Sequence, residues 1–299
     1  MPIHPIKKLR YWLEYIGLRG LSACLSILPH GLAARLAGML AYGVGRLSRG
    51  QATALQNITI AFPDLSQKEK SKLVKACWLH LGSMLADACH MQAIEAELNK
   101  LMRLEHQDLV EQAKAQGKSL LLLSAHYGNW EVNSFFSNLL GLSPFYIYRK
   151  INNPYIDKWM RKRRGHWQGE LLAKGNDTRR ALVKSFQQGR DNGLMFDQHY
   201  TQGKPTLFFG KACQSASGPV ELALKYDYEM ILVQGWRVDR GWWRRPNFII
   251  RFERLDRPLD KNMDNGEKAV AILNTANRAL QRWIGEHPEQ WFWMHKRWR

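Results

Sequence analysis

A histidine and a glutamate five residues apart are the residues of this sequence best suited to acid–base chemistry. They are His126 and Glu131, which bound the stretch HYGNWE. An imidazole paired with a carboxylate can remove the proton of a hydroxyl group, because the carboxylate fixes the tautomer of the ring and stabilises the imidazolium that forms. The pair therefore indicates proton abstraction from an alcohol.

The same spacing also arises by chance, with the histidine ending a strand and the glutamate capping a helix. The surrounding sequence favours chemistry. The run SLLLLSA at 119–125 is typical of a strand buried on both faces, and residues 131–140 predict a helix. Gly128 lets the chain turn sharply between them, so the corner can bring the two side chains together. Glu131 falls in the first turn of that helix, where the helix dipole favours a carboxylate.

Neither a covalent nucleophile nor a metal site is expected. The G-x-S-x-G elbow is absent, and Ser124 lies within the strand run. No C-x-x-C motif occurs, and the adjacent Cys89 and His90 lack a second pair of ligands, so we expect no metal and no cofactor. The widely spaced cysteines fit a reducing compartment; they are Cys24, Cys77, Cys89 and Cys213.

Strands alternate with helices along most of the chain, which predicts an α/β layered domain. A capping box formed by Ser66 and Glu69 opens a helix that should run to about residue 97. Further strands are expected at 144–148, 193–196, 230–235 and 247–254. Further helices are expected at 107–117, 153–165, 177–189, 217–227 and 264–286, and 57–63 is expected to be a connector.

The most lipid-like region is 11–47, which Pro29 and Gly31 divide into two helical pieces. No uninterrupted apolar run reaches the ~20 residues of a spanning helix. Three interpretations stay open: a tilted anchor, a helical hairpin in the membrane interface, or core helices of a soluble protein. We favour membrane association, with 1–50 as an anchoring segment and 51–299 as the catalytic domain. No signal peptide is evident.

The composition is strongly basic. The 299 residues include 44 Lys and Arg against 26 Asp and Glu, a net charge of +18, together with 12 Trp. Such a chain attracts polyanions: nucleic acid, an anionic lipid surface or a phosphorylated substrate. The basic and aromatic stretches 236–245 and 291–299 lack an RNA-binding motif, so we expect them at a lipid interface and expect no nucleic-acid partner.

Several ordered sequence blocks carry a resemblance to a known family. LLLLSAHYGNWE resembles the H-x4-D/E signature of glycerolipid-type acyltransferases, and more narrowly that of the bacterial lipid A late (secondary) acyltransferases. The supporting blocks are AFPDLS at 61–66, YRKINNPYIDKWMRKRRG at 148–165, FDQHY at 196–200 and PEQWFWMHKRWR at 288–299. The resemblance extends from about Tyr11 to the end of the chain. It implies a central mixed sheet flanked by helices, with a membrane-associated helical arm at the N-terminus.

The resemblance also implies a reaction. A hydroxyl of an acylated glucosamine disaccharide attacks the thioester of an acyl carrier protein, without a metal or a covalent intermediate. His126 would be the general base and Glu131 its supporting carboxylate. Asn129, or backbone amides near Gly128, would stabilise the oxyanion. The partners implied are the acyl carrier protein, a phosphorylated lipid A precursor and inner-membrane lipids, with the active site on the cytoplasmic side.

Substrate binding is expected from further matched positions. Arg149 and Arg164 belong to a basic segment whose simplest interpretation is a solvated face, but a guanidinium fork also matches the phosphates of lipid A precursors. Asp197 and Gln198 follow a predicted strand and match the family's DQ motif, so they should reach the same crevice. Glu170 and the Ser217-Gly218-Pro219 turn are weaker candidates.

Two alternatives remain beside this hypothesis. The first is an acyltransferase of the same fold that acts on another glycolipid or an aminolipid. The second is a basic peripheral membrane or nucleic-acid-binding protein without catalysis. The second explains the charge and the tryptophans, but it leaves the ordered motifs unexplained.

Overall fold

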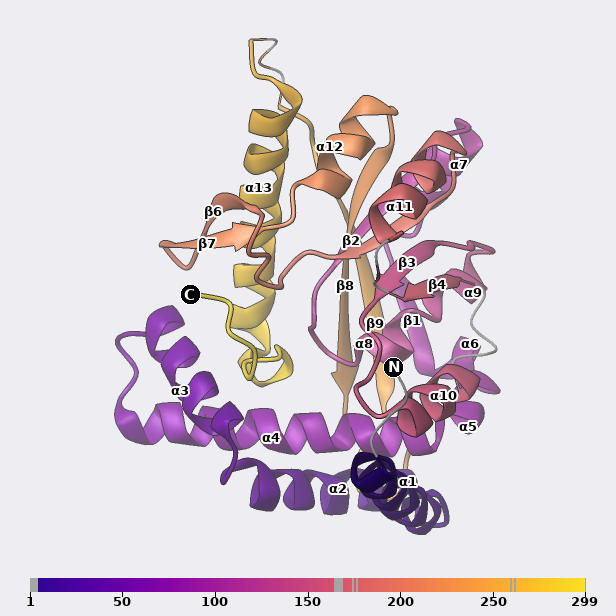
Figure 1. Ribbon diagram of the computed structural model, residues 1–299, viewed down its shortest axis with the longest axis vertical. Helices are drawn as coiled ribbons and strands as arrows, with labels where there is room; N and C mark the ends of the chain where they lie inside the picture. Colours follow the sequence, from indigo (N-terminus) through magenta and orange to yellow (C-terminus); the bar gives the residue numbers. More distant parts are fainter. Residues whose placement is uncertain are drawn as a thin grey trace.

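The computed structural model describes residues 5–163, 169–173, 175, 177–258, 260 and 262–298. Its centre is a seven-stranded sheet with the order β1-β9-β8-β2-β5-β3-β4 (Figure 1). These strands are β1 (Met102–Glu105), β2 (Leu120–Ser124), β3 (Phe145–Tyr148), β4 (Glu170–Ala173), β5 (Asn192–Met195), β8 (Glu229–Val238) and β9 (Asn247–Arg254). β8 and β9 pair antiparallel and the other neighbouring pairs are parallel, which confirms the expected mixed α/β sheet.

β2 lies at the centre of the sheet and is buried on both faces, as its apolar run predicts. Leu121 and Leu123 belong to one hydrophobic core, and Leu120 and Leu122 belong to the other. Because successive side chains of a strand point to opposite faces, a continuous apolar run suits a strand covered by helices on both sides.

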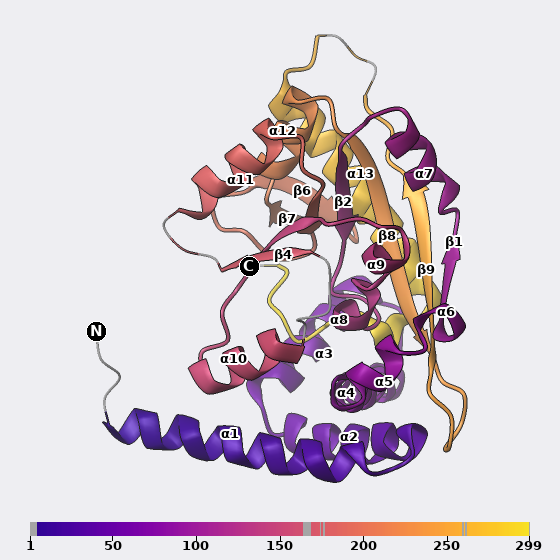
Figure 2. The same ribbon diagram turned by 90° about the vertical axis from the view of Figure 1, so that its right-hand side faces the viewer.

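Helices cover both faces of the sheet, and Figure 2 shows α7 on the side opposite α11 and α12. One core joins the sheet to α11 (Thr178–Gln187), α12 (Gly218–Lys225) and α13 (Asn265–Glu286). The other joins it to α7 (Asp108–Ala115), α8 (Trp130–Asn133) and α9 (Phe136–Leu139). A separate antiparallel hairpin, β6 (Lys204–Phe208) and β7 (Lys211–Ser215), packs beside α13.

The N-terminal helices form a layer below the sheet. They are α1 (Pro5–Ser26), α2 (His30–Gly45), α3 (Arg49–Ala61) and α4 (Gln67–Cys89). In Figure 1 the arrowhead of β8 points toward α4, and α2 lies beneath α4. The carboxyl ends of β8, β2 and β5, which run parallel, therefore face this layer. α1 is tied to the start of α10 (Pro154–Arg163), where Asn153 Nδ2 donates to the carbonyl oxygen of Tyr11 over 2.8 Å.

Several helix limits follow local signals. The Ser66 side chain accepts from the Glu69 amide over 3.3 Å, and Glu69 Oε2 accepts from the Ser66 amide over 2.8 Å, so the predicted capping box is confirmed. α4 ends at Cys89, earlier than expected. The helix is interrupted at His90, and the chain continues as two short helices, α5 (Met91–Glu95) and α6 (Leu98–Leu101).

The expected division of the N-terminal region into two helical pieces is confirmed, since α1 and α2 meet near Pro29. Among the described residues, no helix combines the length and the apolar content that crossing a bilayer takes. The membrane association of this region and the domain boundary at residue 50 stay predictions. Residue 50 lies within α3.

Some elements depart from the sequence expectation. The predicted connector at 57–63 is largely helical, because α3 continues to Ala61, and the helix expected at 131–140 is divided into α8 and α9. β1, β4 and the β6–β7 hairpin were not expected. These strands have four or five residues each, too few to show a clear alternation of apolar and polar positions.

Candidate active site

The carboxyl ends of two neighbouring parallel strands bring His126 and Asp197 together. In the β2–β5 register, Ser124 lies opposite Met195, and each functional residue follows two positions later. His126 Nδ1 lies 2.8 Å from Asp197 Oδ1, and the His126 backbone amide donates to Asp197 Oδ2 over 3.0 Å. The Asp197 carboxylate thus fixes both the ring and the backbone amide of His126.

Burial and charge act in opposite directions on His126. Desolvation disfavours the imidazolium, but the charge and hydrogen bond of Asp197, together with the charge of Glu131, raise the pKa of His126 above its ordinary value. Asp197 is fully buried, yet the His126 imidazole outweighs the effect of burial and lowers the pKa of the Asp197 carboxyl. Asp197 is therefore a carboxylate that can stabilise a positive charge on His126.

The other ring nitrogen of His126 faces the exposed side of the site. With Nδ1 donating to Asp197, Nε2 carries the lone pair, and Gln198 Nε2 lies 3.1 Å from it, so the amide donates to it. About 16% of the His126 side chain is exposed. A hydroxyl group that replaced the Gln198 amide would meet the basic nitrogen directly.

The C-terminal segment holds the Asp197–Gln198 turn in place. Trp291 Nε1 donates to Asp197 Oδ2 over 2.9 Å, and His295 Nε2 lies 3.2 Å from the Asp197 carbonyl oxygen. The fully buried Arg297 donates to the Gln198 carbonyl oxygen over 3.0 Å. This segment lies directly after the short helix η1 (Pro288–Gln290).

The prediction that 291–299 forms a lipid-interface surface is wrong. Trp291, Trp293 and Trp298 are buried, and their rings pack in the core shared by α13 and the β6–β7 hairpin. The segment also clamps the turn after β2, because the Phe292 amide donates to the His126 carbonyl oxygen over 2.9 Å. Composition marked this stretch as interfacial, but here the aromatic rings fill a core.

The turn between His126 and Glu131, the candidate catalytic turn, requires a glycine at its corner. Gly128 has a φ of 61°, and a Cβ there would lie 2.1 Å from the Gly235 carbonyl oxygen. The amides around this corner are engaged within the protein: the Tyr127 amide donates to the Ala125 carbonyl oxygen and the Gly128 amide to the Gln290 carbonyl oxygen. The amides of Tyr127 and Gly128 thus already have acceptors within the protein.

Asn129 is buried and caps α8, with its Oδ1 accepting from the Val132 amide over 3.3 Å. Its Nδ2 donates to Asp87 Oδ2 over 2.7 Å. Asn129 therefore lies behind the turn, as part of its support, rather than on the exposed side of His126.

Asp87, on α4, is the centre of a second buried cluster. His30 Nε2 lies 2.6 Å from Asp87 Oδ1, and Arg237 Nε donates to Asp87 Oδ2 over 2.9 Å. Burial opposes ionisation, but Arg237 and His30 outweigh it and lower the pKa of the Asp87 carboxyl. The cluster joins α2, α4, β8 and the catalytic turn through one charge. The sequence alone does not indicate this cluster, because its residues are far apart in the chain.

Glu131 lies in the first turn of α8, as expected, and is partly buried. Its charge contributes to the raised pKa of His126 after the contributions of Asp197. The carboxylate that hydrogen-bonds to the imidazole is Asp197. The sequence predicts Glu131 in that role and Asp197 among the substrate-binding residues.

The remaining expected binding residues are dispersed. Arg149 is exposed just after β3. Arg164 lies outside the described residues. Glu170 begins β4, at the edge of the sheet opposite the catalytic turn, and pairs with Arg190 over 2.7 Å. Ser217 precedes α12 as its N-cap residue. Over the described part of the chain, no three His, Cys, Asp or Glu side chains are grouped so as to hold a metal ion.

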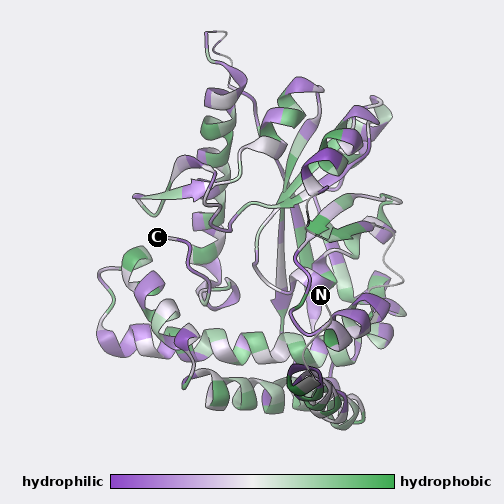
Figure 3. Cartoon of the chain, in the orientation of Figure 1, coloured by the Kyte–Doolittle hydropathy of each residue, from purple (hydrophilic) through white to green (hydrophobic). Residues whose placement is uncertain are grey.

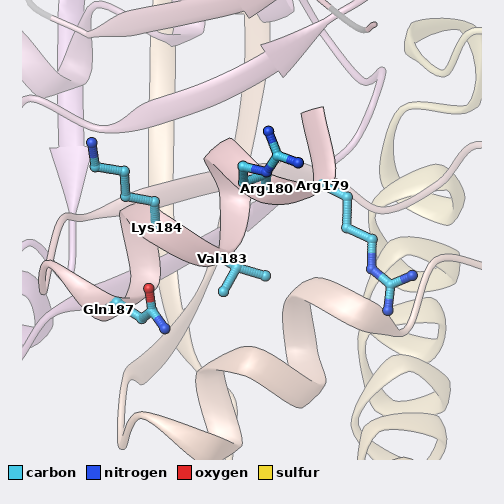
Figure 4. A pocket seen from close by; sticks show the side chains of 5 residues that line it. All are labelled: Arg179, Arg180, Val183, Lys184 and Gln187. Carbon is cyan, nitrogen blue, oxygen red and sulfur yellow. The ribbon is translucent and has the colours of Figure 1, made fainter. Parts of the chain in front are cut away.

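A hollow lies along α11, away from the catalytic turn. Figure 4 shows the five side chains that line it, and three of them are basic. They are Arg179, Arg180, Val183, Lys184 and Gln187. It carries no acid–base pair, but it concentrates positive charge on an exposed helix.

The chain is similar over nearly its whole length to known proteins. The model of the family described as bacterial lipid A biosynthesis acyltransferase matches residues 4–299. Lipid A biosynthesis palmitoleoyltransferase of Escherichia coli is 23% identical over 99% of this chain and 93% of its own length. The lauroyltransferase and the myristoyltransferase of lipid A biosynthesis from the same organism are 22% and 21% identical, over 99% and 96% of this chain and 93% and 87% of their own lengths.

Proposed function

Because the chain belongs to the bacterial lipid A biosynthesis acyltransferase family, and is therefore an acyltransferase, we propose that it transfers a fatty acyl chain from acyl carrier protein to a lipid A precursor. The acceptor is a hydroxyl on an acyl chain that the precursor already bears. The single observation that carries the mechanism is the orientation of His126, with Nδ1 bound to Asp197 and Nε2 facing outward.

His126 is the general base in this proposal. Asp197 holds its tautomer and stabilises the imidazolium, and Glu131 adds a second negative charge nearby. The raised pKa of His126 strengthens it as a base once it is deprotonated. Gln198 donates to Nε2 in the resting site and would turn toward the acceptor oxygen when that oxygen takes its place.

The reaction is a direct acyl transfer. The acceptor oxygen attacks the thioester carbonyl carbon as His126 Nε2 takes the hydroxyl proton. A tetrahedral intermediate forms, and its collapse breaks the carbon–sulfur bond. The proton then passes from the imidazolium to the departing thiolate of the carrier, leaving an ester on the acceptor and a free thiol.

Basic side chains are proposed to bind both the acceptor and the carrier protein. Arg149 and Arg164 are proposed to bind the phosphates of the acceptor, since guanidinium groups match phosphate oxygens in pairs. The basic side chains along α11 are proposed to meet the acidic carrier protein. The proposed location is the inner membrane, with the site on its cytoplasmic side, where the carrier protein and the precursor can meet.

An assay with purified protein tests the proposal. Lipid A precursors of different acylation states are combined with carrier proteins that bear different acyl chains. The products are identified by mass spectrometry. The wild-type protein is expected to add one acyl chain to a precursor. His126→Ala is expected to lose roughly 100- to 10,000-fold in rate while it remains folded.

Two results would change the proposal. Transfer only to another glycolipid or to an aminolipid would retain the chemistry and replace the acceptor. Full activity of the His126→Ala variant would remove the general base on which the mechanism depends.

A further inference from the structure

The exposed large apolar side chains are concentrated on one part of the molecule. Among the described residues, all but Ile151, Tyr200 and Leu207 lie on α1, on α2 and the residues beside its ends, or in the loop between β8 and β9. Figures 1 and 2 both place α1 and α2 below α4, and Figure 2 shows the β8–β9 loop descending to the level of α2. Figure 3 shows that hydrophobic residues recur along α2.

α2 has its large apolar side chains on its outer side, the reverse of a surface helix in water. Its inner side is built of small residues, and a Cβ added at Gly38 would lie 2.8 Å from the Leu79 carbonyl oxygen of α4. Its large apolar side chains point outward: Leu36, Met39, Leu40 and Val44 are 40% to 65% exposed. In water this arrangement would leave the apolar area unburied, so the outer face fits an apolar environment.

α1 repeats this arrangement. Tyr11, Ser22 and Leu25 form the buried side of the helix. Ile6, Leu9, Leu13 and Ile16 recur at helical spacing on another side and are 45% to 75% exposed. α1 thus carries apolar side chains on the side that packs against the protein and on a side that faces outward. The outward side needs an apolar partner from outside the protein.

The β8–β9 loop contacts α2 although the two are far apart in the chain, with Arg35 and Trp242 as one contacting pair. The Arg35 guanidinium lies 3.9 Å from the centre of the Trp242 ring. A Cβ at Gly31 would lie 2.0 Å from the Gly241 carbonyl oxygen, so the two backbones touch. Trp242 and Trp243 nevertheless remain 52% and 75% exposed. Two adjacent exposed indoles held against an apolar helix are suited to the headgroup region of a bilayer.

The positive charge around these apolar side chains indicates an anionic bilayer. The chain from 27 to 50 contains three arginines and no acidic residue. In the β8–β9 loop, Arg240 and Arg244 are exposed on either side of the two tryptophans. Basic side chains that border an apolar face attract anionic lipid headgroups electrostatically.

We infer that α1, α2 and the β8–β9 loop form one lipid-binding face for an anionic bilayer, with Trp242 and Trp243 as an anchor separate from the N-terminal helices. The purpose of this face rests on the proposed function: it presents the carboxyl edge of the sheet, where His126 lies, to a lipid acceptor. The N-terminal region and the loop then approach the membrane as one rigid surface.

Vesicle flotation with the full chain tests the inference. The vesicles contain phosphatidylethanolamine with phosphatidylglycerol, and matched vesicles contain phosphatidylcholine alone. The double variant Trp242→Ser/Trp243→Ser is expected to bind anionic vesicles roughly tenfold more weakly than wild type. Leu207→Ser, which removes an exposed apolar side chain from β6, is the matched control and is expected to bind as wild type does.

Activity separates this inference from the proposed function. In detergent micelles that contain the acceptor, the double variant should transfer acyl chains at the wild-type rate, whereas on vesicle-embedded acceptor it should lose activity in parallel with binding. If wild-type protein transferred no acyl chain in micelles, the proposed function would fail, and flotation would still report on the lipid-binding face.

Tryptophan fluorescence gives a second test that does not depend on how the loop variant folds. In a Trp12→Phe protein, Trp242 and Trp243 are the exposed tryptophans that remain among the described residues. Brominated lipids are expected to quench part of its fluorescence. Absence of quenching, or vesicle binding by the double variant equal to wild type, would overturn the inference.

Discussion

The imidazole of His126 has one nitrogen committed to the protein and one available for exchange with a ligand. Nδ1 is held by the buried Asp197, while Nε2 accepts from the side-chain amide of Gln198 over 3.1 Å. An amide can rotate away at little cost, since its other hydrogen bonds can form to water. The resting site is therefore closed by a group that an acceptor hydroxyl can displace.

Replacement of Gln198 tests this interpretation of the resting site. In Gln198→Ala, the acceptor hydroxyl no longer competes with the amide, but it also loses a donor that could hold it. We expect KM for the acceptor to rise roughly fivefold to tenfold, as for loss of one hydrogen bond, with a smaller change in kcat. Steady-state kinetics with varied acceptor concentration measure both. An unchanged KM would show that Gln198 does not contact the acceptor.

Part of this residue-scale picture could be predicted from the sequence. The positions of His126 and of Asp197 after strands were predicted, because the apolar runs before them are plain. Their pairing was not, since it depends on β2 and β5 being neighbours with Ser124 opposite Met195. Nothing in the local sequence of either strand specifies its neighbour in the sheet, so the nearer carboxylate in sequence, Glu131, was given the role.

The elements around the site are fastened by buried charge. α2, α4, β8 and the catalytic turn meet at Asp87, whose carboxylate binds His30, Arg237 and Asn129. A buried ion pair with additional hydrogen bonds can be close to neutral in energy, but the loss of one partner leaves the other charge unsatisfied. The cluster therefore makes the placement of Asn129 and of α8 dependent on α4.

Removal of this charge should destabilise the protein strongly. Asp87→Ala removes the buried carboxylate that pairs with Arg237 and leaves only its ion pair with the exposed Asp239, so we expect a loss of about 3–5 kcal/mol in the free energy of unfolding. Asn129→Ala removes one hydrogen bond and a helix cap, and should cost about 1–3 kcal/mol. Urea denaturation followed by circular dichroism measures both. Equal stability of Asp87→Ala and wild type would contradict the role of the cluster.

The corner of the catalytic turn should tolerate no side chain. Gly128→Ala forces a Cβ to within 2.1 Å of a backbone oxygen at a positive φ, so the turn must shift. We expect a loss of about 1–3 kcal/mol in stability together with a large fall in kcat. Gly117→Ala is the matched control, because Gly117 also has a positive φ but no atom lies within 4 Å of its added Cβ. A control that lost as much activity would show that the conformation alone, and not the contact, matters.

At the scale of the whole molecule, charge and apolar area are segregated by surface. The catalytic edge of the sheet faces the N-terminal layer, while the basic hollow along α11 lies on a flanking helix (Figures 1 and 4). The excess of 18 positive charges was evident from composition. Its distribution was not, because an unfolded sequence does not show which tryptophans become core, as Trp291 does, and which stay exposed, as Trp243 does.

Charge reversal on α11 tests the proposed docking of the carrier protein. We expect Arg180→Glu/Lys184→Glu to raise KM for the acyl carrier protein roughly tenfold at low salt, with kcat nearly unchanged, because electrostatic attraction mainly affects encounter. The difference from wild type should shrink as salt increases. Lys68→Glu/Lys72→Glu, on the exposed start of α4, changes the net charge by the same amount and is the control. If it had the same effect, the total charge rather than α11 would account for the result.

The pH dependence of kcat/KM tests the central claim, that His126 is a base held by Asp197. A base acts only when deprotonated, so the raised pKa of His126 places the acidic limb of the wild-type profile above the ordinary histidine value of 6.5. In Asp197→Asn, that limb should move to lower pH, and the plateau should fall roughly 100- to 10,000-fold as the tautomer is lost. Glu131→Gln should move the limb less. A wild-type profile in Asp197→Asn, with the shift and the loss found in Glu131→Gln instead, would contradict the assignment.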